Sequence, residues 1–252
     1  MKIIENVSYN EKITPRLDVY LPEESSFPVF VYFHGGGLTG GDKASASLRK
    51  AFSYLAERGI AVISANYRMY PDCNFPDFIE DAASVTAWAF ENMQGYGNVE
   101  GIYVGGSSAG GYLSMMLCFD GKWLGAHGID PLKVTGWFHD AGQPTAHFEV
   151  LRRTGRDGRR VIVDETSALF HVGLAKEYSP MRFIISDNDI AGRYEQTMLM
   201  LNTLKRFGFK KFDHVLMHGD HCAYCDARDE EGNVILGKLI LDFVKNGVNA
   251  KA

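Results

Sequence analysis

The stretch that most constrains the fold is residues 101–117, where a strand-like segment, a cluster of small residues and an apolar helix-like segment follow one another directly. Between the two apolar segments lies the run Gly106-Ser107-Ser108-Ala109-Gly110. It matches the pattern G-x-S-x-G, in which a serine occupies a sharp strand-to-helix turn and glycines prevent collisions with neighbouring backbone. The motif by itself does not separate this interpretation from a small-residue turn that carries no chemistry, so other parts of the chain must decide.

The rest of the chain alternates between strand-like and helix-like segments. The sequence predicts strands at residues 2–9, 16–21, 29–33, 60–64, 102–104, 134–138, 181–186 and 212–217. It predicts helices at residues 45–58, 78–92, 195–207 and 234–244, and one that begins at residue 112. This alternation predicts an α/β fold with a doubly wound, mostly parallel sheet and antiparallel strands at its start. Because no repeat or linker interrupts it, we expect a single domain over 1–252.

Charge and apolar patterning exclude several classes of partner. The chain has a net charge of −5, which gives no reason to expect nucleic acid as a partner. No apolar run approaches the length of a membrane span, and the first residues lack the apolar core of a signal peptide. Four cysteines in 252 residues do not suggest a disulfide framework. We therefore expect a cytoplasmic protein without a membrane or nucleic-acid partner.

A second glycine-rich run, His34-Gly35-Gly36-Gly37, follows the apolar strand at 29–33. Acyl transfer needs backbone N–H groups directed at the developing oxyanion, and side chains would obstruct that approach. A phosphate-binding loop is disfavoured, because neither glycine-rich run ends in Gly-Lys-Ser or Gly-Lys-Thr. The pairing of this run with a later G-x-S-x-G indicates a hydrolase.

These motifs resemble the hormone-sensitive-lipase-like branch of the α/β-hydrolases, which includes small bacterial carboxylesterases and acetyl esterases. The matching segments are residues 34–37, residues 66–71 with Phe75-Pro76 and Asp81, and residues 106–111. The resemblance implies the α/β-hydrolase fold and an oxyanion hole formed by the amides of Gly36, Gly37 and Ala109. It also implies Ser108 as the nucleophile, since Ser107 would lose the geometry of the turn.

The sequence departs from this branch in two ways. Ser107 stands where the branch usually has Asp before the nucleophile. Only strand-like residues precede His34, whereas many members carry a helical cap there.

The acid and base of a Ser-Asp-His triad should follow the strands at 181–186 and 212–217, because that is the chain order of the triad in this fold. Asp187 and Asp189 are the candidate acids, and the family's spacing favours Asp189. His218 and His221 are the candidate bases, and the family's Gly-x-His pattern favours His221. We expect His214, which lies within the strand, to be structural.

The run from His218 to Cys225 also allows a different interpretation. His218 and His221, with the C-x-x-C pair Cys222 and Cys225, could ligate zinc, or the two cysteines could be redox-active. No second cysteine pair is present and the hydrolase chemistry already requires a histidine here, so we expect neither a metal nor a cofactor.

Residues 143–178 form the one sizeable insertion, which we expect to cover the site as a small cap. A helix at 145–154, ended by Gly155, is favoured over a hairpin turn at Asp157-Gly158. Five arginines lie in it, at 152, 153, 156, 159 and 160. They are typical of a solvated surface, with contact to an anionic substrate or a partner subunit as the alternative.

Together these features predict a serine esterase with a Ser108-His221-Asp189 triad that hydrolyses small, acetyl-type carboxylic esters through an acyl-enzyme. We expect bulky residues at 137, 138, 139 and 148 to narrow the acyl side of its pocket. The alternatives are an arylformamidase or amidase with the same machinery, and a hydrolase fold that binds ligands without turnover. The sequence does not decide the natural ester or the oligomeric state, although a homodimer is compatible with it.

Overall fold

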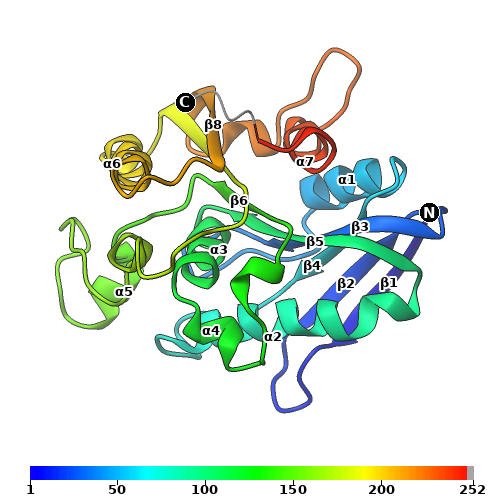
Figure 1. Ribbon diagram of the computed structural model, residues 1–252, viewed down its shortest axis with the longest axis horizontal. Helices are drawn as coiled ribbons and strands as arrows, with labels where there is room; N and C mark the ends of the chain where they lie inside the picture. Colours follow the sequence, from blue (N-terminus) through cyan, green and yellow to red (C-terminus); the bar gives the residue numbers. More distant parts are fainter. Residues whose placement is uncertain (249–252) are drawn as a thin grey trace.

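The computed structural model describes residues 1–248 and contains, within that range, an eight-stranded sheet with helices on both faces (Figure 1). Its strands are β1 (Lys2–Ser8), β2 (Arg16–Leu21), β3 (Ser26–Phe33), β4 (Ala61–Ala65), β5 (Asn98–Ser107), β6 (Gly136–Asp140), β7 (Met181–Asn188) and β8 (Phe212–Asp220). They lie in the order β1-β2-β4-β3-β5-β6-β7-β8. The β1–β2 and β2–β4 pairs are antiparallel and the other pairs are parallel.

The helices divide between the two faces of the sheet. On one face α1 (Ala46–Ala56) packs against α7 (Ile235–Asn246), and on the other α2 (Asp77–Asn92) packs against α3 (Ala109–Phe119). Apolar residues of α6 (Arg193–Arg206) join the core on the α2–α3 face. The shorter helices are α4 (Lys122–Gly125) and α5 (Phe148–Arg153), and the 3₁₀ turns are η1 (Met93–Gly95), η2 (Pro131–Lys133), η3 (Ala168–His171) and η4 (Ala223–Cys225).

Burial explains why β3 lies in the middle of the sheet. From Val29 to Phe33 every side chain is at most 1% exposed. A parallel strand covered on both faces reads as a continuous apolar run, as this one does. Its neighbour β5 carries the G-x-S-x-G segment at its carboxyl end, so the two glycine-rich runs meet at one edge of the sheet. Ligands bind at this edge in open α/β sheets.

The predicted strands and helices are all present, with shifted ends. β5 begins at Asn98 instead of residue 102, because residues 98 and 99 already pair with the start of β3. β8 continues to Asp220, which pairs with Asn188, so His218 lies inside this strand. The helix predicted at 145–154 is shorter, since α5 begins only at Phe148. Residues 249–252, which complete the predicted single domain, lie outside the described part of the chain.

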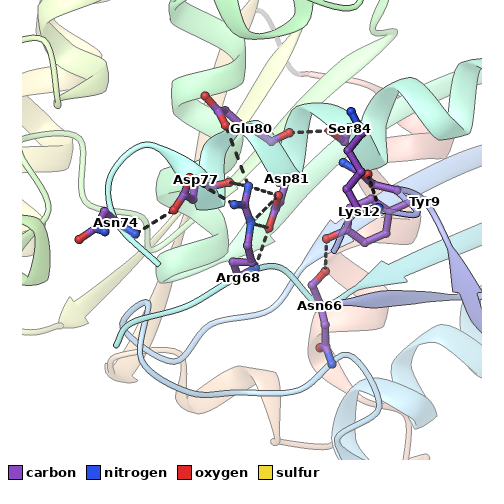
Figure 2. Close-up of polar contacts among 10 residues, drawn as sticks. Tyr9, Lys12, Asn66, Arg68, Asn74, Asp77, Glu80, Asp81 and Ser84 are labelled. Carbon is purple, nitrogen blue, oxygen red and sulfur yellow. Dashed lines mark hydrogen bonds and ion pairs between the residues drawn. The ribbon is translucent and has the colours of Figure 1, made fainter. Parts of the chain in front are cut away.

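An ion-pair network fastens the loop after β4 to α2 (Figure 2). The guanidinium of Arg68 donates to both carboxylate oxygens of Asp81, at distances of 2.7 to 3.1 Å, and the Arg68 backbone N–H donates to the same group at 2.8 Å. Asp81 is almost fully buried. The Tyr9 hydroxyl donates to the carbonyl of Asn66 in the same loop. This loop is thereby held at the edge of the sheet where the two glycine-rich runs meet.

Replacing Asp81 by alanine should destabilise the fold, because the change leaves the Arg68 guanidinium without its closest acceptor. We expect the Asp81→Ala substitution to lower the free energy of unfolding by at least about 2 kcal/mol. Glu80→Ala is the matched control: Glu80 is exposed, lies 4.0 Å from Arg68, and its loss should change stability by no more than about 0.5 kcal/mol. Denaturant unfolding measures both, and equal effects would contradict the assigned role of Asp81.

Candidate active site

Ser108 lies on a strained turn between β5 and α3. Its φ of 56° and ψ of −111° are rarely adopted by residues other than glycine. The surrounding space explains the glycines of the motif: a Cβ on Gly110 would lie 1.9 Å from the carbonyl oxygen of Phe33, and a Cβ on Gly106 would lie 2.4 Å from the same oxygen. The end of β3 therefore passes so close to the turn that only glycine fits at both positions.

The structure brings Ser108, His221 and Asp189 together. The Nε2 atom of His221 lies 2.8 Å from the Oγ atom of Ser108. The Nδ1 atom of the same ring lies 2.5 Å from Oδ1 of Asp189. Asp189 is held by the N–H of Ile190 and its side chain is 1% exposed. A hydroxyl, an imidazole and a carboxylate are thus arranged in the order that nucleophilic catalysis by serine requires.

The rival acid and base lie together at the surface. The Nδ1 atom of His218 is 2.6 Å from Oδ2 of Asp187, and the N–H of Gly219 also donates to Asp187. The His218 side chain is 85% exposed, against 20% for His221. Neither Asp187 nor His218 lines the cleft that contains Ser108. His214 is part of β8, as expected.

The hydroxyl of Ser107 is engaged elsewhere. It is hydrogen-bonded to the Tyr32 hydroxyl at 2.7 Å and to the Asp140 carboxyl group. Tyr224 donates to the other oxygen of Asp140, which is fully buried. Burial raises the pKa of Asp140 well above its ordinary value. Sequence reasoning missed Asp140, although its place directly after the β6 apolar run was a usable signal.

The glycine-rich loop borders the same cleft. Gly36 has a φ of +120°, and a Cβ there would lie 2.0 Å from the carbonyl oxygen of Gly40. Gly36 and Gly37 line the cleft beside Ser108. Ala109 is buried and is the first residue of α3, so its N–H belongs to the helix-start amides that have no partner within the helix.

Residues 66–71 contact the glycine-rich loop and hold it in place. The hydroxyl of Tyr67 donates to the carbonyl of His34 at 2.8 Å, and the two rings stack with centroids 4.6 Å apart. The N–H of Tyr70 donates to the carbonyl of Leu38 at the far end of the loop. Burial lowers the pKa of His34, which favours its neutral form. The segment that carries part of the family resemblance therefore positions the glycine-rich loop.

The cleft has a volume of about 510 Å³. Its lining comes from the glycine-rich loop, the strand-to-helix turn at Ser108 (the elbow), α1, α5, the β7–α6 loop and the β8–α7 connection. Among the lining residues are Leu48, Phe148, Ile190, Cys222 and Asp226. Of the four bulky residues expected to narrow it, only Phe148 lies on its lining. The prediction is wrong for Trp137, Phe138 and His139, because their side chains pack into the core on the two faces of β6.

The insertion at 143–178 contributes Phe148 to the cleft, and most arginines of the insertion form ion pairs within it. Arg152 and Arg153 contact Glu149, Arg156 contacts Asp164, and Arg159 contacts Asp157. Four of the five arginines are thus paired with carboxylates of the same insertion. These pairs fit the solvated-surface interpretation better than a site for an anionic ligand.

The pKa of His221 is raised to about 9. Burial lowers it, but the hydrogen bonds to Asp189 and Cys222 stabilise the imidazolium and outweigh burial. The Sγ atom of Cys222 lies 3.7 Å from Nε2 of His221. The zinc set considered from the sequence is not assembled, because His218 points to the surface and His221 faces Ser108. Asp140, Cys222 and Cys225 instead place an oxygen and two sulfurs within 4.8 Å of one another.

Comparisons with known proteins find relatives both in sequence and in fold. The family model BD-FAE matches residues 17–125, a range that includes the glycine-rich loop and the elbow and ends before Asp189 and His221. The esterases of Pyrobaculum calidifontis and Thermogutta terrifontis superpose with TM-scores of 0.77 and 0.74 and identities of 21% and 18%. The superpositions cover 98% of this chain in both cases, and 87% and 94% of the esterases. This chain has the α/β-hydrolase fold.

Curated relatives match a shorter stretch. A probable isoprenylcysteine alpha-carbonyl methylesterase of Oryza sativa subsp. japonica is 34% identical over 116 residues, and the carboxylic ester hydrolase LipN of Mycobacterium tuberculosis is 39% identical over 95 residues. The matches cover 45% and 36% of this chain but only 27% and 24% of the relatives. The predicted resemblance to hormone-sensitive-lipase-like esterases is confirmed. Within residues 1–248, no helix has both the length and the apolar character needed to cross a membrane.

The contacts of His221 predict how its ring titrates. In ¹⁵N-detected NMR spectra the His221 imidazole should lose its proton near pH 9, well above the value of about 6.5 for an unperturbed histidine. Asp189→Asn should lower this pKa, because it removes the carboxylate that stabilises the charged ring. Asp187→Asn is the matched control and should leave the titration of His221 unchanged, since Asp187 contacts His218. A wild-type pKa at or below 6.5 would contradict the assigned contacts.

Proposed function

We propose that this α/β-hydrolase is a serine carboxylic ester hydrolase. The observation that carries the proposal is the continuous contact from Ser108 through His221 to Asp189, at 2.8 and 2.5 Å, at the edge of a cleft bordered by a glycine-rich loop. The esterases and carboxylic ester hydrolases among the similar proteins support the same chemistry.

In the proposed reaction Ser108 Oγ attacks the acyl carbon while His221 Nε2 accepts its proton. Asp189 holds the ring through Nδ1 and stabilises the imidazolium that forms. The amides of Gly36, Gly37 and Ala109 receive the oxyanion. His221 then returns the proton to the departing alcohol, and water releases the acyl group from Ser108 by the same steps. Only neutral His221 can accept the first proton, so its raised pKa favours turnover at alkaline pH.

The lining of the cleft supports a preference for esters with short acyl groups. The Phe148 ring lies against Gly37, where its terminal carbon would be 3.4 Å from a Cβ, and the Arg152 guanidinium lies 5.0 Å from the centre of that ring. A bulky side chain beside the proposed oxyanion hole limits the room for the acyl chain. Structures of the Thermogutta terrifontis esterase with propionate and with butyrate bound are similar to this chain and agree with small acyl groups.

An active-site-directed fluorophosphonate tests the nucleophile. One structural neighbour is an esterase phosphorylated by paraoxon, which is the same kind of covalent trapping. The wild-type protein should be labelled, Ser108→Ala should not, and Ser107→Ala should still react. His221→Ala and Asp189→Asn should each lower kcat on p-nitrophenyl acetate by roughly 10³-fold or more.

The matched controls His218→Ala and Asp187→Asn should stay within about threefold of the wild-type rate, because these residues do not contact Ser108. Folded wild-type protein that is not labelled would favour a hydrolase fold that binds without turnover. A higher rate on a formyl-anilide than on the acetyl ester would favour an arylformamidase or amidase.

A series of p-nitrophenyl esters tests the acyl side. We expect the highest kcat/KM from acetyl to butyryl and a fall of at least roughly tenfold by octanoyl, because overfilling a packed pocket costs about 1–3 kcal/mol. Phe148→Ala should move the optimum toward longer chains. Phe170→Ala is the matched control, since Phe170 lies in the same insertion but is exposed and does not line the cleft. A wild-type optimum at octanoyl would refute the small acyl pocket.

A further inference from the structure

Two thiols lie in the cleft that contains Ser108. Cys222 and Cys225 are both free, partly exposed and part of the cleft lining. The other two cysteines, Cys73 and Cys118, are buried away from it. The proposed hydrolysis uses neither Cys222 nor Cys225, so their presence in the cleft is unexplained by that reaction.

The backbone holds these two thiols at a spacing that a disulfide can bridge. Cys222 directly precedes the 3₁₀ turn η4, and the N–H of Cys225 donates to the carbonyl of Cys222 at 2.9 Å. Such a turn keeps the Cα atoms of its first and fourth residues within about 7 Å, near the range that disulfides span. The two sulfur atoms lie within 4.8 Å of each other. Little backbone movement is therefore needed to join them.

The surroundings of the two thiols differ. Cys222 lies 3.7 Å from the ring of His221, and hydrogen bonds with Cys225 and with that ring lower the pKa of Cys222. Cys225 lies 3.7 Å from both Ser107 and the buried Asp140, and its hydrogen bond with Cys222, together with burial, raises its pKa. Reactive cysteines are those that are accessible and stabilised as thiolates. This description fits Cys222, whereas Cys225 resembles a resolving thiol.

We propose that Cys222 and Cys225 form an oxidisable dithiol in the cleft, in which Cys222 reacts with peroxides and Cys225 closes the disulfide. The Cys222 thiolate attacks one peroxide oxygen, so that an S–O bond forms, the O–O bond breaks and the departing alkoxide or hydroxide takes a proton from water. The sulfur is oxidised by two electrons and the peroxide is reduced. Cys225 then attacks the Cys222 sulfur, the S–O bond breaks, and hydroxide leaves with the Cys225 proton as water.

The test measures covalent chemistry at the two thiols, because the rate of ester hydrolysis does not report on them. Folded wild-type protein, treated first with a chelator, is exposed to hydrogen peroxide and then mapped by mass spectrometry. We expect a loss of two hydrogens, with the new bond joining Cys222 to Cys225. In a separate experiment with iodoacetamide at neutral pH, Cys222 should react at least roughly a hundredfold faster than Cys73, whose pKa burial raises to about 11.

Three variants complete the test. Cys225→Ser should leave a sulfenic acid on Cys222 that dimedone traps, and Cys222→Ser should remove both that adduct and the disulfide. Cys73→Ser is the matched control: peroxide should still join Cys222 to Cys225 in it, and its Cys222 should react with iodoacetamide at the wild-type rate. The proposal is overturned if peroxide forms no disulfide between Cys222 and Cys225 in the folded protein, or if Cys225 reacts with dimedone or iodoacetamide faster than Cys222 does. It is also overturned if elemental analysis shows a metal that stays bound to the thiols after chelation and protects them from oxidation.

Discussion

The close approach of the end of β3 to the turn at Ser108 is the constraint on which the rest of the site depends. The carbonyl oxygen of Phe33 occupies the space that a Cβ at Gly106 or Gly110 would need. This contact brings the residues after β3, which form the glycine-rich loop, beside the hydroxyl of Ser108. Two segments more than sixty residues apart in the chain therefore share one edge of the sheet, and the candidate oxyanion hole follows from backbone packing.

At the residue before Ser108 the chain departs from the usual pattern of the related branch. Ser107 stands where an aspartate is usual, and the neighbouring strand β6 supplies the carboxyl group of Asp140 as a hydrogen-bond partner of Ser107. Tyr32 and Tyr224 complete the hydrogen bonds of this buried cluster. Satisfied buried polar groups keep a unique geometry, since each unpaired one would be costly. The cluster also connects the Ser108 turn to Cys225, and thereby to the dithiol.

Hydrogen bonds from residues outside the cleft hold the glycine-rich loop, which forms part of the cleft lining. Tyr67 bonds to His34, and Arg68 fastens the same segment to α2 through Asp81. The glycine-rich loop has few side chains of its own to pack, so its position depends on these neighbours. This dependence gives a physical reason for the resemblance in residues 66–71, which do not line the cleft themselves.

The order of strands and helices, the elbow and the two glycine-rich runs could be read from the sequence, because periodicity and glycine requirements are local. Which acid meets which base could be favoured only through the family resemblance, because Asp187 and Asp189 are two residues apart and local patterns do not separate them. The pairing of β7 with β8 directs Asp189 toward His221 and Asp187 toward His218. The sequence also did not show that the side chains of Trp137, Phe138 and His139 are buried in the core, because that depends on which elements cover the two faces of β6. Asp140 joins Ser107 and Tyr224 only because parallel strands align their carboxyl ends, a relation between distant segments that local patterns do not contain.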